Sequence, residues 1–338
     1  MSGDFPSFEL AELHTHLGGS ISPATYWEIA QDVGYVLPER DYHKFIKYVT
    51  ISPKDPAPLD EYFDKVYHRL LDNLSSGIRA AKKGVYEIFS GSYRSNQVRL
   101  LELRTNPMKH NNDGTVDMDQ LIMSMLRGME QALLAYPKLS AGLIFCLARE
   151  FDIARNAVVV EKAIKYRKRG IVGVDFAGPY RDFDAKEYGK LFAKARENGL
   201  GLTMHAGEQK SLDYMWKIVE FFKPDRIGHG IYAAYDAKLM KELVKQDIAL
   251  EICPLANLAT KTVENADEMR WILRTFVENG VKFTINTDWA EMIEGNHLRE
   301  VFKWLYEEKI LSEEELRRCN DLAFKRSFIK SSGLEAYL

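Results

Sequence analysis

The sequence contains few cysteines, no long hydrophobic run and no marked excess of charge. Its 338 residues include three cysteines, an odd and widely spaced set that is typical of reduced thiols, so we expect a cytoplasmic protein. No apolar run approaches the ~18 residues that span a bilayer, and the first residues have neither the basic nor the apolar part of a secretory signal. We therefore expect no membrane partner.

Charge of the two signs is nearly balanced along the chain. Lys and Arg number 46 and Asp and Glu number 49, which gives a formal net charge of −3. The basic residues are scattered, so a nucleic-acid partner is not expected, because it requires a concentrated basic surface. No obligatory protein partner is evident either. We expect one domain over residues 1–338 that acts on a small molecule.

Short apolar runs alternate with amphipathic stretches. The expected strands are Phe8–His14, Val98–Arg104, Ser140–Cys146, Gly170–Phe176, Gly201–His205, Asp225–His229, Ile248–Cys253 and Val281–Asn286. The expected helices between them include Ile153–Arg169, Ala185–Asn198, Ser211–Phe222, Asp236–Gln246 and Glu264–Asn279. This alternation predicts a parallel sheet in an α/β fold. Eight units fit a (β/α)8 barrel of the TIM type, and an open doubly wound sheet is the alternative.

Two segments add to this pattern. Residues 34–80 carry four prolines among several aromatic residues, which predicts an insertion of short helices after the first strand. It is either a packed excursion or a lid over the mouth of the barrel. Near the C-terminus, Ser312 with Glu315 three residues later forms a capping box, which predicts the start of an additional helix.

Four of the eight histidines lie at or just beyond the ends of expected strands. In a barrel these ends converge on one face, where active sites lie. His14 and His16 are two residues apart, so both rings point to the same side of an extended segment. His205, His229 and Asp288 follow at three further strand ends. Imidazole and carboxylate groups suit Zn²⁺, so the sequence predicts one zinc site per chain.

Each of these residues alone, and Glu208 three residues after His205, has a simpler interpretation. His205 fits a core histidine, Asp288 a helix cap and Glu208 a solvated loop charge. One shared site explains the set better than separate accidents at several strand ends. The remaining histidines lack such positions and are expected on the surface or on helices; they are His43, His68, His110 and His297.

At the level of motifs, the chain resembles the adenosine deaminase family of zinc amidohydrolases. The matching segments occur in the family's order and cover most of the chain; they are Glu12–Ser20, Glu102–Pro107, Gly173–Gly178, His205–Glu208, Arg226–Gly230, Glu251–Asn257 and Thr287–Asp288. The resemblance implies a (β/α)8 barrel in which zinc is bound by His14, His16, His205 and Asp288.

The resemblance also implies roles for residues around the metal. Glu208 would be the proton donor, and His229 would orient the attacking hydroxide, with Asp288 as a third catalytic group. Gly178 would lend a backbone N–H to a purine ring nitrogen, and His16 would lie beside the substrate. The other zinc deaminase signature, H-x-E with P-C-x-x-C, is absent.

Two positions depart from the family pattern. Trp289 stands where members usually have a carboxylate, and an indole N–H can only donate a hydrogen bond. Trp289 would then donate to the purine, stack on it, or turn outward. Gly18 stands where many adenosine-specific members have an acid for the ribose. These changes favour a substrate with a bulkier or absent 5′-hydroxyl.

The leading hypothesis is a zinc-dependent hydrolytic deaminase that converts a 6-aminopurine nucleoside, adenosine or a 5′-substituted adenosine, to the 6-oxo product and ammonia. One alternative is a metal-dependent deaminase or hydrolase of another amino-heterocycle, such as adenine or aminodeoxyfutalosine. The other is a non-catalytic nucleoside-binding barrel, which would not need Glu208 and His229 beside a metal.

Overall fold

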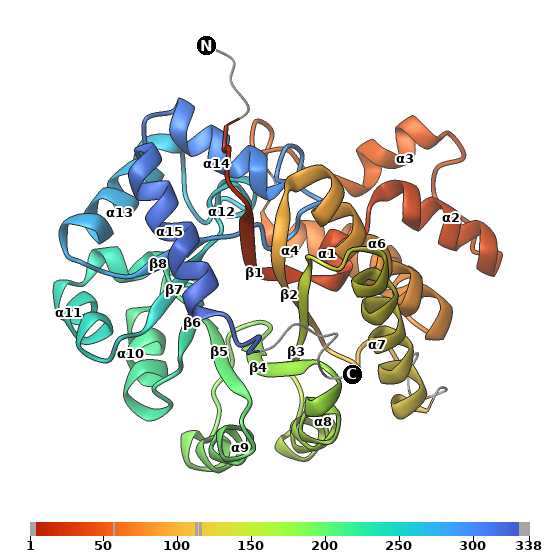
Figure 1. Cartoon of the computed structure of the whole chain (residues 1–338), viewed down its shortest axis with the longest axis horizontal. Helices are drawn as coiled ribbons and strands as arrows, with labels where there is room; N and C mark the ends of the chain where they lie inside the picture. The colour runs from red at the N-terminus through yellow and green to blue at the C-terminus, as the bar shows by residue number, and fades with distance from the viewer. Residues whose placement is uncertain (1–4, 57, 112–113, 115–116, 331–338) are drawn as a thin grey trace.

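The strands form one parallel barrel (Figure 1). The computed structural model describes residues 5–56, 58–111, 114 and 117–330. The strands are β1 (Leu10–His16), β2 (Val98–Thr105), β3 (Ser140–Ala148), β4 (Ile171–Ala177), β5 (Gly201–Ala206), β6 (Arg226–His229), β7 (Ala249–Ile252) and β8 (Phe283–Ile285). Their spatial order follows the chain from β1 to β8, and every neighbouring pair is parallel.

The barrel closes between β1 and the residues that follow β8. Thr15 and Asp288 form a parallel bridge. The His16 N–H donates to the Asp288 carbonyl at 2.8 Å, and the Asp288 N–H donates to the His14 carbonyl at 2.8 Å. The expectation of a (β/α)8 barrel is therefore confirmed, and the open doubly wound sheet is excluded because its strand order would not follow the chain.

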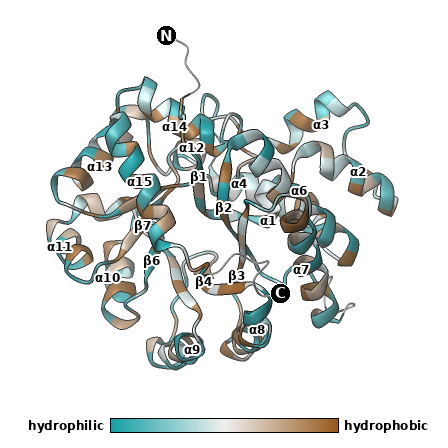
Figure 2. Cartoon of the chain, viewed as in Figure 1, coloured by the Kyte–Doolittle hydropathy of each residue, from teal (hydrophilic) through white to brown (hydrophobic). Residues whose placement is uncertain are grey.

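Helices surround the strands (Figure 1). They are α1 (Leu17–Ser20), α2 (Pro23–Val33), α3 (Tyr42–Val49), α4 (Leu59–Tyr62), the π-helix η1 (Phe63–Leu71), α5 (Asp72–Leu74), α6 (Ile78–Asn96), α7 (Met118–Ala135), α8 (Ile153–Tyr166), the 3-10 helix η3 (Arg167–Arg169), α9 (Ala185–Glu197), α10 (Leu212–Phe221), the 3-10 helix η4 (Ile231–Tyr235), α11 (Ala237–Lys245), α12 (Pro254–Ala259), α13 (Ala266–Glu278), α14 (Leu298–Glu307) and α15 (Glu313–Arg326). Hydrophobic and hydrophilic residues alternate along the outer helices, as expected when one face packs on the strands (Figure 2).

Local sequence explains where these helices begin and end. Side chains of Asp152, Asp184 and Asp236 accept hydrogen bonds from the first backbone N–H groups of α8, α9 and α11. The capping box of Ser312 and Glu315 opens α15 as expected. Within the described residues, no helix is both long and apolar enough to cross a membrane.

The insertion after β1 contributes to the barrel mouth. Helices α2 and α3 lie at the right of Figure 1, and the π-helix η1 follows them. Tyr67 and His68 of η1 line the same cavity as the strand ends. His110 was expected on the surface or on a helix, and this was wrong. It lies in a turn after β2 and is buried, with 4% exposure.

Candidate active site

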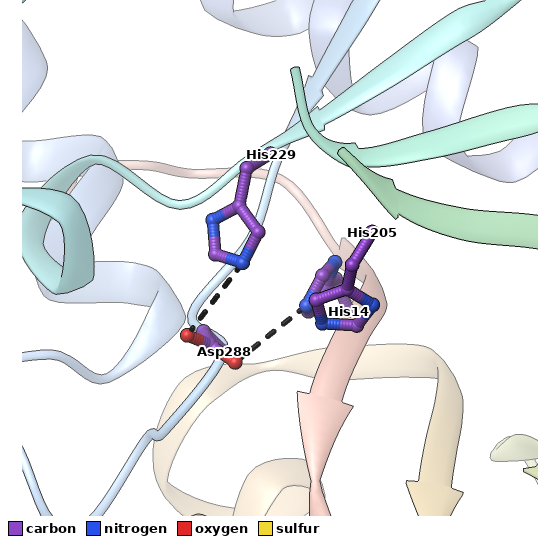
Figure 3. Close-up of side chains that lie close together, drawn as sticks. All are labelled: His14, His205, His229 and Asp288. Carbon is purple, nitrogen blue, oxygen red and sulfur yellow. Dashed lines mark ion pairs between the residues drawn. The ribbon is translucent and has the colours of Figure 1, made fainter. Parts of the chain in front are cut away.

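Side chains from four places in the barrel converge at its C-terminal face (Figure 3). His14 comes from β1, His205 from β5, His229 from the end of β6, and Asp288 from just beyond β8. One ligand atom of each lies within 4.8 Å of the others. The Asp288 carboxylate is central, with Oδ1 at 3.5 Å from His14 Nε2 and Oδ2 at 3.9 Å from His229 Nε2.

His16 joins the same cluster from the end of β1. Its Nε2 lies 3.1 Å from Nε2 of His205 and 3.4 Å from Oδ1 of Asp288. The structure therefore brings together all four residues expected to bind zinc. His14 Nε2 is buried and has no hydrogen-bond partner among the described residues. Such an orphaned nitrogen, facing other imidazoles and a carboxylate, fits a site for a cation such as Zn²⁺.

Burial sets the protonation of these groups. Removal from water lowers the pKa of His14, His16 and His205, and the neighbouring histidines reinforce the effect at His14 and His16. The rings are therefore neutral, which is the form that binds a metal. Burial raises the pKa of Asp288 to about 7, while His229 opposes that rise.

Charged residues inside the barrel hold the histidines in place, and the sequence interpretation gave them no role. Glu251 Oε2 lies 2.8 Å from His14 Nδ1, and Asp175 Oδ1 lies 3.0 Å from His205 Nδ1. Arg104 donates to both carboxylates, at 2.8 and 3.1 Å. All three are completely buried. The signal available in the sequence was the single charged residue inside β4 and inside β7.

Two residues of the site have unusual backbone angles. His229 has φ of 60° and Asp288 has φ of 63°, in the left-handed region that non-glycine residues rarely occupy. Glu12 supports the backbone next to Asp288. The N–H and the hydroxyl of Thr287 donate hydrogen bonds to the Glu12 carboxylate at 3.1 and 2.8 Å. Backbone strain of this kind clusters at functional sites.

Two further polar groups flank the cluster. Glu208 Oε2 lies 3.8 Å from His229 Nε2, and the Glu208 side chain lines the cavity. On the other side of the ring, Asn257 Nδ2 lies 3.2 Å from His229 Nδ1. The Nε2 side of the ring therefore faces Glu208 and Asp288.

The cluster lies in a cavity of about 650 Å³, which is the usual size of a small-molecule site. The expected substrate-contacting residues His16, Gly18, Gly178 and Trp289 all line it. Gly178 has φ of +97°, a conformation that favours glycine.

Comparison with known proteins identifies the family. The family model described as adenosine deaminase matches residues 9–336. An adenosine deaminase from Clostridium botulinum (strain 657 / Type Ba4) is 30% identical over 285 residues, covering 84% of each chain. The chain belongs to the adenosine deaminase family. It is therefore a hydrolytic deaminase.

Solved structures of other proteins show the same fold. An adenine deaminase from Arthrobacter aurescens has a TM-score of 0.82 at 19% identity, covering 97% of this chain and 95% of its own. An amidohydrolase from Burkholderia ambifaria, solved with bound Zn, has a TM-score of 0.81 at 19% identity, covering 99% and 89%.

Trp289 of this deaminase lies inside the cavity wall, not at the outer surface. Its side chain is buried, with 6% exposure, and it stacks on Tyr67 with ring centroids 5.4 Å apart and planes 13° apart. Gly19 backs the indole so closely that a Cβ there would lie 2.4 Å from Trp289 Cγ. Trp289 and Tyr67 thus form an aromatic wall beside Asp288.

The space beside Gly18 is occupied, although the glycine was expected to favour a substrate with a bulkier or absent 5′-hydroxyl. A Cβ on Gly18 would lie 2.4 Å from the Tyr67 hydroxyl. The insertion therefore fills the volume that a side chain at this position would take. In this deaminase, a larger residue at position 18 and the observed position of Tyr67 exclude each other.

Proposed function

We propose that the protein is a zinc-dependent deaminase of a 6-aminopurine nucleoside, adenosine or a 5′-substituted adenosine, which it converts to the 6-oxo product and ammonia. The observation that carries this proposal is the meeting of His14, His16, His205 and Asp288 at one end of a cavity, beside Glu208 and His229. A binding protein would have no need of a carboxylate and an imidazole beside a metal site.

His14, His16, His205 and Asp288 are proposed to hold the zinc. When bound, zinc lowers the pKa of a coordinated water to about 7 and so supplies a nucleophile at neutral pH. The chain's part is to keep the rings neutral and correctly turned, which the contacts of Asp175 and Glu251 support.

Protons are proposed to move through three side chains. Glu208 donates one to the ring nitrogen next to the carbon under attack, which accepts electron density as the ring loses aromaticity. The Nε2–H of His229 orients the water oxygen, and Asp288 accepts a proton from the water. That proton leaves on the ammonia, and the second water proton restores Glu208, so the reaction consumes one water.

Two backbone and side-chain features are proposed to position the base. The Gly178 N–H would donate to a purine ring nitrogen, and the aromatic wall of Trp289 and Tyr67 would face the ring. Segment 34–80 would act as a lid, because Tyr67 and His68 of that segment line the cavity.

The test is release of ammonia from a panel of amines by the zinc-loaded protein. The panel contains adenosine, 5′-modified adenosines, adenine and aminodeoxyfutalosine. Turnover of an adenosine, seen as ammonia and as the change in ultraviolet absorbance, is the expected result. Ammonia from the other amines but from no adenosine would favour the amino-heterocycle alternative, and no turnover with stoichiometric zinc would favour a non-catalytic binder.

A further inference from the structure

A short segment after α15 packs on the end of the barrel where the strands begin, opposite the metal cluster (Figure 1). We define residues 326–328 as the barrel plug. A Cβ on Gly173 of β4 would lie 2.8 Å from Phe328 Cδ2, and the three atoms nearest to a Cβ on Gly201 of β5 all belong to the Phe328 ring. The two glycines therefore leave the space that this ring fills.

The barrel plug holds two charged residues that are completely buried inside the barrel, Arg226 of β6 and Glu102 of β2. Arg226 Nη1 donates to the Arg326 carbonyl at 2.7 Å, and the guanidinium carbon lies 3.7 Å from the centroid of the Phe328 ring. Glu102 Oε1 accepts from the Ser327 hydroxyl at 2.7 Å and from the Phe328 N–H. Arg226 and Glu102 also form an ion pair with each other, so the plug fixes both members of one buried pair.

This pair continues as a chain of contacts to the metal cluster. Arg226 Nε donates to Glu251 Oε1 at 2.6 Å, and Glu251 Oε2 lies 2.8 Å from His14 Nδ1. Glu102, Arg226, Glu251 and His14 are all completely buried. Because the planar guanidinium uses a different nitrogen for each partner, its position determines where the Glu251 carboxylate lies. The Glu251 contact in turn orients the ring whose Nε2 faces Asp288.

The Phe328 ring also keeps water away from this chain. It covers the Arg226 guanidinium and is itself only partly buried, so it separates the charge from the solvent. Charges attract each other much more strongly where water is excluded. Loss of the ring would let water solvate Arg226 and loosen its contact with Glu251.

We propose that the barrel plug is a positioning element of the metal centre, which acts through Arg226 and Glu251 to fix the orientation of the His14 ring. This inference rests on the zinc site of the proposed function. None of the three described plug residues lines the cavity, so the plug touches neither the proposed metal ligands' cavity nor a substrate in it. A change at one end of the barrel is therefore expected to alter metal binding at the other.

The experiment measures metal binding by full-length wild type and Phe328→Ala, without substrate. Zinc affinity is obtained by competition with a chromogenic chelator, and the ligand geometry is followed by the visible spectrum of the Co²⁺-loaded protein. The Kd for zinc should rise by about 3- to 10-fold, less than for loss of a direct partner of a ligand, and the cobalt bands should change. Phe276→Ala is the control because Phe276 is a completely buried ring on the outer helix α13; it should lower the Tm and leave both readouts unchanged.

Gly201→Ala is the second variant, because its methyl group would enter the space of the Phe328 ring. It should raise the Kd for zinc by a similar factor on its own and should add nothing in the Phe328→Ala background, where that space is vacant. Gly189→Ala is its control, since a Cβ there would meet nothing within 4 Å.

The outcomes separate this inference from the proposed function. Wild-type zinc affinity and an unchanged cobalt spectrum in both Phe328→Ala and Gly201→Ala, whatever their Tm, would show that the plug only stabilises the fold, and would leave the proposed function standing. A wild type that binds neither Zn²⁺ nor Co²⁺ would overturn the proposed zinc site and this inference together.

Discussion

Asp175 holds His205 by the ring nitrogen that faces away from the cluster. Its Oδ1 lies 3.0 Å from Nδ1 of His205, so Nδ1 carries the hydrogen and Nε2 is left to face His16 and Asp288. Although burial opposes it, the charge of Arg104 and the hydrogen bond from His205 keep the pKa of Asp175 well below its usual range. The carboxylate is therefore ionised, and it both orients the ring and raises its basicity as a ligand.

Asp175→Asn should weaken zinc binding by about 10- to 100-fold, because the amide keeps the shape of the carboxylate but loses its charge. The affinity is measured by competition with a chromogenic chelator. Asp182→Asn serves as the control. Asp182 is a fully exposed carboxylate whose Oδ1 lies 3.7 Å from Lys217 Nζ in a surface ion pair. Equal zinc affinity in Asp175→Asn and wild type would show that the contact does not support the metal.

Removal of the metal should abolish turnover and lower the Tm. Zinc that binds only the folded chain adds about 2.7 kcal/mol at a free concentration of 100 Kd. Dialysis against a chelator, followed by addition of Zn²⁺, should remove and then restore both activity and Tm. A Tm that does not respond to the chelator or to added zinc would contradict a metal site at His14 and its neighbours.

Glu208→Gln should keep zinc bound and lose about 10² to 10⁴ in kcat, because an amide cannot donate the proton that the ring nitrogen needs. Zinc content by elemental analysis and turnover of the best substrate are measured on the same sample. Glu220→Gln, on the outer helix α10, is a suitable control. Near wild-type turnover in Glu208→Gln would remove Glu208 from the mechanism.

The sequence predicted the barrel because its strands are apolar and its helices amphipathic, which are local patterns. Its boundaries were less accurate where a strand ends in polar residues. The first strand was expected at Phe8–His14, but β1 extends from Leu10 to His16. The polar residues at 14–16 stay in the strand because the backbone of the closing segment pairs with them.

The positions of Glu251 and Glu150 could not be predicted from the sequence. Both depend on contacts with residues distant in the chain, His14 in one case and Gly178 in the other. The same holds for Tyr67, whose hydroxyl reaches Gly18 from an irregular insertion. The sequence motifs predicted which side chains lie at the strand ends. Only the three-dimensional structure shows which of these side chains contact one another.

His110 should make stability depend on pH. Burial lowers its pKa to about 4, with Lys109 acting in the same direction and Asp72 against it. The ring stays neutral in the folded chain while the unfolded chain takes up a proton below about 6.5. The contribution of His110 is therefore lost as the pH falls from about 6.5 to about 4, by about 3 kcal/mol in total, because each pKa unit is worth about 1.4 kcal/mol.

The measurement is urea unfolding of wild type and His110→Asn at a series of pH values. Asparagine keeps a hydrogen-bonding group near Ser75, whose Oγ lies 3.2 Å from His110 Nδ1, but it does not titrate. The difference between the two stabilities should shrink as the pH is lowered across this window. A difference that stays constant from pH 7 to pH 4 would show that His110 takes up a proton equally in both states.

Gly18 and Tyr67 should be energetically coupled, because a Cβ at position 18 would lie 2.4 Å from the Tyr67 hydroxyl and 3.0 Å from its Cζ. Gly18→Ala should therefore cost about 1–3 kcal/mol of unfolding free energy. The same change in a Tyr67→Phe background should cost less, since the closest atom is gone. A double-mutant cycle from urea unfolding gives the coupling, expected at about 0.5–3 kcal/mol. Gly91→Ala is the control, because a Cβ at position 91 would meet open space. Additive effects of the Gly18 and Tyr67 changes would mean that the Tyr67 hydroxyl does not close this side of the cavity.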